Sequence, residues 1–182
     1  MLRGIVGALL LARGRRDGIE AFRPSLEDAR ASFLAAAICL PIFLLLRAGS
    51  SPAGMVLDPV RSVVGDLIAF VCSWAGFALA SLPIAEAMGR RTLWPRFIAA
   101  WNWMNLVQYV VLAVLSLPSF LGLPGMVADA LGLVGLFYAI WMQWFATRLS
   151  LAVTGAQAAA FVGLDLALSL FLSGLVLQLA QV

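Results

Sequence analysis

Histidine and lysine are absent from this 182-residue chain, and charge of either sign is scarce. Only 12% of the residues are charged, and all twelve basic residues are arginines. Without histidine, the chain lacks the commonest metal ligand and the commonest general base at neutral pH. A glycine-rich phosphate-binding motif is also missing. We therefore expect no metal site, no cofactor, no nucleic-acid binding and no enzymatic activity.

Cysteine is nearly as rare. Cys39 and Cys72 each lie inside an apolar stretch, and they form neither a CxxC pair nor a disulfide framework. A thiol in such surroundings behaves as a small hydrophobic side chain. We interpret both cysteines as structural.

Hydrophobic residues make up 63% of the chain, and the mean hydropathy is +1.01. A water-soluble fold has no means of hiding that much apolar surface. Because a membrane-spanning helix takes about 20 residues, the sequence predicts an all-α, polytopic membrane bundle of about five transmembrane helices, forming one domain over residues 1–182. The predicted spans are 32–46, 63–85, 97–117, 127–147 and 156–180, and residues 1–31 form a cytoplasmic or interfacial lead-in.

The lead-in begins with a short apolar stretch, Leu2 to Ala12, followed by arginines. This pattern favours a short helix in the membrane interface. Its acyl-chain face would then consist of Ile5, Val6, Leu9 and Leu10. A weakly structured terminus is the alternative. Further on, Ser25 followed by Glu27 and Asp28 indicates a helix start.

The first predicted span is short. Its fifteen residues cover roughly 22 Å at about 1.5 Å per residue. Arg30 and Arg47 at its two ends can lengthen it by extending their charged heads to the interfaces. Pro41 is expected to kink it.

Orientation follows from the arginines, because cytoplasmic loops collect positive charge. With a cytoplasmic N-terminus, ten arginines lie inside and only Arg47 and Arg61 lie outside. The C-terminus is then outside, and a bacterial cytoplasmic membrane is the expected location. The predicted contacts with anionic lipid are Arg13, Arg15, Arg16, Arg90, Arg91 and Arg96. Five tryptophans near the inner ends of spans three and four indicate an interfacial aromatic belt: Trp94, Trp101, Trp103, Trp141 and Trp144.

Polar residues inside the spans are the candidate functional residues, since they are costly in lipid. Asp165 in span five leads this set. Its predicted neighbours in an intramembrane polar cluster are Asn102, Asn105 and Tyr109 on one face of span three, Gln143 on span four, and Arg148 as a counter-ion. Two interpretations remain open: a proton- or substrate-handling site, or a cluster that fixes how the helices pack.

The other acids have simpler interpretations. Asp66 and Asp129 each lie near the start of a helix, where an acid complements the helix dipole. Glu86 precedes Arg90 by four residues and is expected to pair with it.

Span five also carries small residues at four-residue spacing, Ala159, Gly163 and Ala167. Such a stripe lets another helix approach closely. We favour packing within the bundle, and a surface for a partner is the alternative.

Four stretches resemble the bacterial branch of the Yip family of five-span membrane proteins. They are AFRPSLEDARASF before span one, EAMGRRTLWPRFIAAWNW between spans two and three, the SLPSFLGLP turn, and the link TRLSLAVTGAQAAA. The resemblance implies a five-span membrane organiser or adaptor. The Asp-Leu-x-Gly-Pro element of eukaryotic members is absent, and no catalytic residue is carried over.

These observations favour a non-catalytic inner-membrane protein that acts as a membrane organiser, adaptor or complex-assembly subunit. Its expected partners are anionic lipid head groups, and other membrane proteins or further copies of itself. The alternative is a small transporter or channel subunit that uses the polar cluster around Asp165. An intramembrane enzyme is the weakest hypothesis, because the chain lacks the usual catalytic groups.

Overall fold

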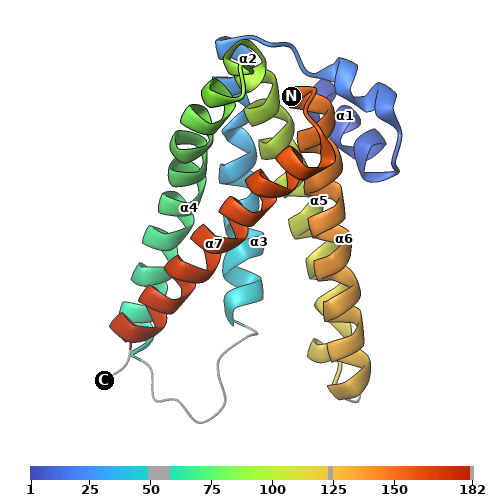
Figure 1. Ribbon diagram of the computed structural model, residues 1–182. Coiled ribbons are helices and arrows are strands. Elements are labelled where there is room, and N and C mark those ends of the chain that lie inside the picture. Colours follow the sequence, from blue (N-terminus) through green and yellow to red (C-terminus); the bar gives the residue numbers. More distant parts are fainter. Residues whose placement is uncertain (49–57, 123–124, 181–182) are drawn as a thin grey trace.

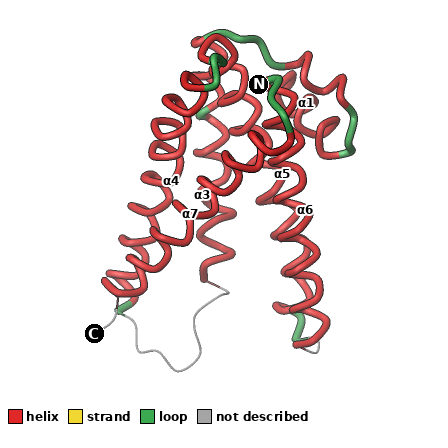
Figure 2. Tube along the Cα trace, in the orientation of Figure 1, coloured by secondary structure: helices red, strands yellow, loops and turns green. Residues whose placement is uncertain are grey.

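The computed structural model describes residues 1–48, 58–122 and 125–180, and these form helices joined by short turns (Figures 1 and 2). In chain order the elements are α1 (Leu2–Ala12), η1 (Arg16–Ala21), α2 (Leu26–Ser32), α3 (Leu34–Ala48), α4 (Pro59–Ala87), η2 (Arg91–Leu93), α5 (Trp94–Phe120), α6 (Gly125–Leu151) and α7 (Gly155–Ala180). Five helical segments in the described ranges are long and apolar enough to cross a membrane, and the first of them combines α2 with α3. This confirms the predicted helical membrane bundle with a short N-terminal helix.

Capping residues mark where three of the helices begin. Ser25 accepts a hydrogen bond from the amide of Asp28 and starts α2, as predicted. Asp58 caps α4 by accepting from two first-turn amides. Thr154 and Gln157 form a reciprocal capping box at the start of α7. Caps are polar, so they lie outside the apolar runs from which the spans were predicted.

The N-terminal segment is a folded part of the bundle. Helix α1 packs against η1 and against α5. The approach is so close that a Cβ on Gly4 would fall 2.5 Å from the Trp103 ring nitrogen, and one on Gly7 would fall 2.5 Å from the Cβ of Ala21. The alternative of a weakly structured terminus is therefore wrong. Of the predicted apolar face, Val6 and Leu9 are exposed, whereas Ile5 and Leu10 are partly buried.

The long helices associate mainly as two pairs. Helix α4 packs along α7, α5 packs along α6, and α3 lies against α5. Figure 1 shows that the two pairs converge at the end that holds the N-terminus, and that they separate towards the end that holds the C-terminus. Figure 2 shows the same arrangement along the Cα trace.

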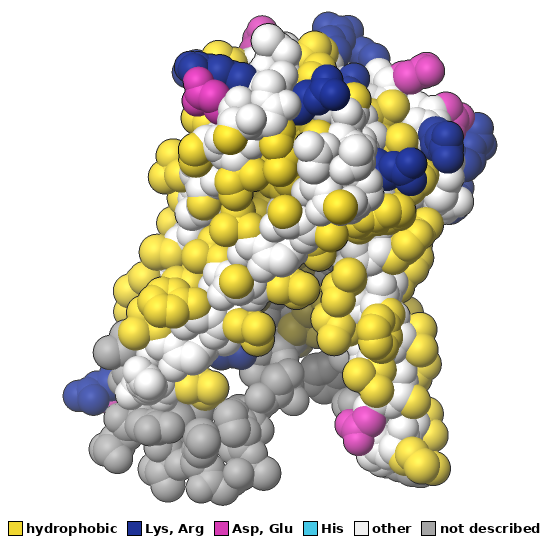
Figure 3. All heavy atoms as spheres, viewed as in Figure 1, with side chains coloured by type: hydrophobic (Ala, Val, Ile, Leu, Met, Phe, Trp, Pro, Cys, Tyr) yellow, Lys and Arg dark blue, Asp and Glu magenta, His cyan; other side chains and the backbone are white. Residues whose placement is uncertain are grey.

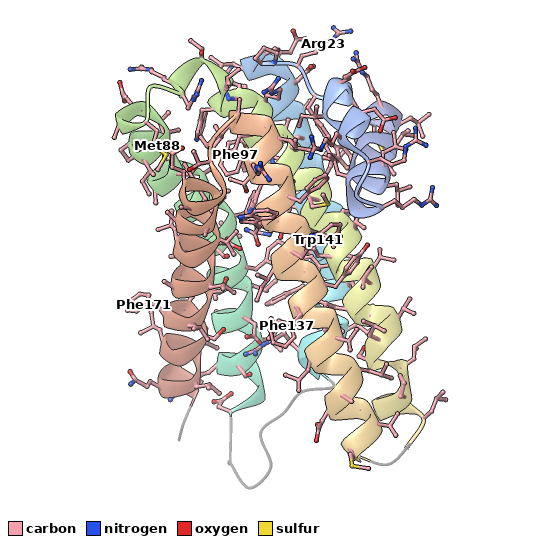
Figure 4. The ribbon with its side chains drawn as sticks, turned by 45° about the vertical axis from the view of Figure 1, so that its right-hand side comes forward. Arg23, Met88, Phe97, Phe137, Trp141 and Phe171 are labelled. Carbon is pink, nitrogen blue, oxygen red and sulfur yellow. The ribbon has the colours of Figure 1, made fainter. Side chains whose placement is uncertain are left out.

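The core occupies the convergent half. From Phe97 to Met104 every residue of α5 is buried, because α1, α2, α3 and α6 all pack against this helix. Phe97 itself stacks edge-on against Phe161 of α7, and its position near the top of the bundle is labelled in Figure 4. Helix α5 is therefore the central helix of the fold.

The divergent half exposes large apolar side chains. On α6 and α7, Phe137 is 67% exposed and Leu170 is 73% exposed. Apolar side chains cover much of the face in Figure 3, while most of the charged side chains visible there gather at the convergent end. An apolar belt of this kind is what a lipid-facing surface requires.

The tryptophans are mostly part of the core. Trp101 and Trp103 are buried, and Trp101 stacks on Phe77 with ring centroids 4.4 Å apart. Trp94 and Trp144 are partly buried. The prediction of an interfacial belt is therefore wrong for Trp101 and Trp103, because the folded lead-in covers the inner part of α5.

Candidate functional site

One end of the bundle is strongly basic. The N-terminal segment, the α4–α5 turn and the α6–α7 turn meet there, and together they carry ten of the twelve arginines. We call this the basic end; its arginines are Arg3, Arg13, Arg15, Arg16, Arg23, Arg30, Arg90, Arg91, Arg96 and Arg148. Five acidic residues also lie at this end, which leaves it a net charge of +5.

Five of the six predicted lipid contacts are exposed: Arg13, Arg15, Arg16, Arg90 and Arg91. The sixth has a different role. The Arg96 guanidinium donates hydrogen bonds to the backbone carbonyls of Ser150, at 2.6 and 2.8 Å, and of Leu149, at 3.2 Å. It satisfies carbonyls at the end of α6 that have no partner within the helix. Arg96 therefore ties α5 to α6, and its prediction as a lipid contact is wrong.

Two of the exposed arginines have acidic partners. A hydrogen bond from Arg15 lowers the pKa of the Asp17 carboxyl, so Asp17 stays ionised and offsets the charge of Arg15. Arg91 pairs with Glu86 at 2.6 Å. The expected Glu86–Arg90 pair does not form, because α4 ends at Ala87 and the chain turns through Gly89 at φ +68°.

The leading intramembrane candidate, Asp165, is joined to a second helix. The Gln143 side-chain nitrogen of α6 donates to the Asp165 carboxylate of α7 at 2.8 Å. These two residues are the part of the predicted cluster that the structure brings into direct contact. Asp165 thus links the two helix pairs of the bundle.

The other predicted members have different partners. Asn102 donates to the Ser32 hydroxyl at 2.7 Å and so joins α5 to α2. Asn105 donates to the Trp101 carbonyl of its own helix. Both Asn105 and Gln143 lie along the contact between α5 and α6, which has no room for a water molecule. Tyr109 packs its ring against Phe43.

Arg148 is not the counter-ion of Asp165. It is exposed, and its guanidinium lies 5.6 Å from the centre of the Trp144 ring. Gln143, which faces Asp165, precedes Arg148 by five residues, so the two side chains point to different sides of the helix. Arg148 forms no ion pair with any residue in the described parts of the chain.

Asp66 forms the bundle's buried ion pair. Its carboxylate accepts from the Arg47 guanidinium of α3 at 2.8 and 2.9 Å. The Asp66 side chain is 10% exposed and that of Arg47 is 33% exposed. The structural interpretation of Asp66 therefore holds, although its partner is Arg47 as well as the helix dipole. The expectation that Arg47 extends its charged head to the interface is wrong. Asp129 is exposed in the first turns of α6, as its interpretation requires.

The small-residue stripe lies on the outside of the bundle. Ala159, Gly163 and Ala167 are all exposed, and nothing in the described structure lies within 4 Å of a Cβ built on Gly163. The contact between α7 and α4 instead uses the glycines of α4: a Cβ on Gly65 would meet Val176 at 3.2 Å. The prediction that the stripe packs within the bundle is wrong.

Several polar contacts were missed in the sequence. Gln108 donates to the Ala139 carbonyl and joins α5 to α6, and Ser32 is the partner of Asn102. One signal was available for Arg47 and Asp66. They lie near the facing ends of two consecutive predicted spans, which places opposite charges at a similar depth.

Searches of protein families, curated proteins and solved structures found no match to this chain.

Proposed function

We propose that this chain is a non-catalytic multi-pass membrane protein that acts as an organiser, adaptor or assembly subunit, held at anionic lipid by its basic end. The observation that carries the proposal is the gathering of ten arginines at one end of a membrane-spanning bundle. Arg13, Arg16 and Arg90 are exposed there and pair with no acid in the described residues.

The expected strength of this attraction follows from those three side chains. An arginine near an anionic membrane surface contributes about 1 kcal/mol. Three therefore contribute about 3 kcal/mol, or roughly a hundredfold in affinity. Because most anionic lipid faces the cytoplasm, we place the N-terminus in the cytoplasm and the C-terminus outside, in a bacterial cytoplasmic membrane.

The use of polar residues also supports a non-catalytic role. Asn102, Gln108 and Gln143 each form a hydrogen bond that joins one helix to another. Groups used in this way hold the helices of the bundle together. The resemblance to the Yip family supports the same function.

Lipid selectivity provides the test. The protein is purified in mild detergent with mixed phosphatidylglycerol and phosphatidylcholine, and the bound lipid is quantified by mass spectrometry. We expect enrichment of phosphatidylglycerol. Replacing Arg13, Arg16 and Arg90 with Gln should reduce it. Arg61→Gln, a change at the other end of the bundle, is the matched control and should leave it intact.

Equal selectivity in the wild type and the triple variant would refute lipid binding by these three arginines. Crosslinking in intact membranes tests assembly: the proposal requires a reproducible crosslinked partner or oligomer. A reporter that is active only in the cytoplasm, fused after Val182, should be inactive.

A small transporter is the second candidate, and Asp165 is the observation that favours it. Ser169 and Ser173 follow Asp165 at four-residue spacing, so they extend its polar face along α7. Asp165→Asn separates the two roles, because an amide oxygen can still accept from Gln143 but cannot ionise. Loss of a pH-dependent flux with unchanged thermal stability would support transport. Unchanged flux would reject a proton-handling role for Asp165.

A further inference from the structure

A cavity of about 190 Å³ lies among α3, α4, α5 and α7, in the half of the bundle away from the basic end. We call it the serine cavity. Its polar lining consists of Arg47, Asp66, Ser73, Tyr109, Ser169 and Ser173. At about 30 Å³ per water molecule, the volume corresponds to about six waters. Side chains of Phe43, Phe70 and Leu172 complete the wall.

The hydroxyl groups of this lining differ from the others in the bundle. Ser32, Ser81 and Ser116 each donate to a carbonyl of their own helix, which satisfies the hydroxyl locally. Within the described ranges, by contrast, no hydrogen bond is made by the side chains of Ser73, Ser169, Ser173 or Tyr109. Ser73 and Tyr109 are partly buried, whereas Ser169 and Ser173 are exposed. Four unbonded hydroxyls therefore line one space at membrane depth.

Unbonded hydroxyls are unfavourable in an apolar medium, at a cost of about 1 to 3 kcal/mol each. A molecule in the cavity that both donates and accepts hydrogen bonds removes that cost. The serine cavity is therefore suited to a polar occupant, although its helices span the membrane.

The charges of the lining select against ions. The Arg47 guanidinium and the Asp66 carboxylate are the charged groups of the wall, and they are bonded to each other at 2.8 and 2.9 Å. Their charges cancel over most of the space. A cation entering the cavity would meet Arg47 and an anion would meet Asp66, so neither gains a net attraction. An uncharged molecule meets no such opposition.

The convergent half of the bundle closes the cavity towards the basic end. Phe70 in the cavity wall packs on Trp74, which packs on Trp101. Trp74 and Trp101 are both buried, and they lead into the enclosed part of α5. Buried aromatic rings therefore lie between the cavity and the basic end.

From the hydroxyls, the internally neutralised charges and the volume, we propose that the serine cavity binds a small uncharged polar molecule, of the class of short polyols. This site is independent of the proposed lipid contacts, because it uses other residues at the other end of the molecule.

Cysteine accessibility tests whether the cavity holds water. Cys72 is exposed, so it is first replaced by Ala; Cys39 is buried and stays. Ser169→Cys is then compared with Leu170→Cys, its lipid-facing neighbour at nearly equal depth, in liposomes treated with a charged, membrane-impermeant methanethiosulfonate. The thiolate is the reactive form and needs water around it. We expect Ser169→Cys to react at least about tenfold faster than Leu170→Cys.

A second pair of variants controls for local misfolding caused by a single substitution. Ser173→Cys lines the cavity, whereas Phe171→Cys replaces a side chain that points away from the bundle (Figure 4). Thermal stability is measured for all four variants. Equal reaction rates within both pairs, in proteins as stable as their parent, would overturn the proposal.

Glycerol is the probe for the ligand class. Glycerol should slow the labelling of Ser169→Cys at least twofold more than it slows the labelling of Arg61→Cys, an exposed position at the same end of the bundle as the cavity. Sodium chloride of equal osmolality should not. Tyr109→Phe keeps the ring contacts but removes one hydroxyl, and should reduce the protection. If glycerol does not slow the labelling, or if sodium chloride slows it as much, the assignment to an uncharged polar ligand is overturned. The lipid selectivity of the basic end is tested separately.

Discussion

The ion pair between Arg47 and Asp66 allows a quantitative prediction. Removing one partner by Asp66→Asn leaves the Arg47 charge two-thirds buried with no carboxylate beside it. Two charges about 4 Å apart attract by about 4 kcal/mol at an effective dielectric constant of about 20. Because the guanidinium is one-third exposed, we halve this figure. We therefore expect Asp66→Asn to destabilise the protein by about 2 kcal/mol.

The assay is thermal unfolding in detergent, followed by tryptophan fluorescence. For a chain of this length, about 2 kcal/mol corresponds to a decrease in Tm of roughly 4 to 8 °C. Arg47→Met should cause a similar decrease, since it leaves the Asp66 carboxylate unpaired. The double variant Arg47→Met, Asp66→Leu removes both charges and should recover most of the lost stability.

Additivity is the result that would refute this reasoning. If the double variant is as unstable as the two single changes together, the two charges do not interact energetically. Decreases in Tm below about 1 °C for both single variants would lead to the same conclusion. The control is Arg61→Met, which removes an exposed arginine paired with Asp58 and should change Tm little.

Two further predictions concern helix packing. Gly4→Ala places a Cβ 2.5 Å from the Trp103 ring nitrogen, so we expect a loss of about 1 to 3 kcal/mol, measured as a lower Tm. Gly132→Ala is its control, because the added Cβ meets nothing within 4 Å and should be neutral or slightly stabilising. Arg96→Met removes the hydrogen bonds to the Ser150 carbonyl and should lower the free energy of unfolding by about 1.5 to 3 kcal/mol. We expect a protease to cleave the α6–α7 turn faster in this variant than in the wild type. Cleavage at the wild-type rate would contradict the prediction.

The number and order of the helices could be predicted from the sequence because few backbone structures are stable in lipid. A backbone in hydrocarbon must satisfy its own hydrogen bonds, so long apolar runs form helices whatever they pack against. Only their ends differed from the predictions; α4, for example, begins at Pro59, where Asp58 caps it, and the predicted span began at residue 63.

The partners of the polar residues could not be predicted in the same way. A residue's depth follows from its place along a span, but the side it faces depends on how two helices are rotated against each other. Gln143 and Asp165 were assigned to one cluster by depth, and they do meet. Asn102 was assigned to it because it shares a helix face with Asn105 and Tyr109, yet it faces Ser32, which that spacing did not indicate.

The N-terminal segment was the least predictable part. Apart from Arg3, the segment from Leu2 to Ala12 is apolar, so its sequence does not distinguish a helix in the interface from one that packs on protein. Gly4 and Gly7 were the relevant residues, because their lack of a side chain permits the close contacts with Trp103 and Ala21. That role is visible only once the contacting helix is known.

The enclosure of α5 has a consequence for how the chain enters the membrane. The corresponding span has the lowest mean hydropathy of the five, 1.5, and it carries Asn102, Asn105 and Gln108. A translocon that released this helix alone would expose those amides to lipid. Since α6 covers it and follows after a short turn, we expect α5 and α6 to enter together as a hairpin. Synthesis arrested between them should then leave a nascent chain retained at the translocon.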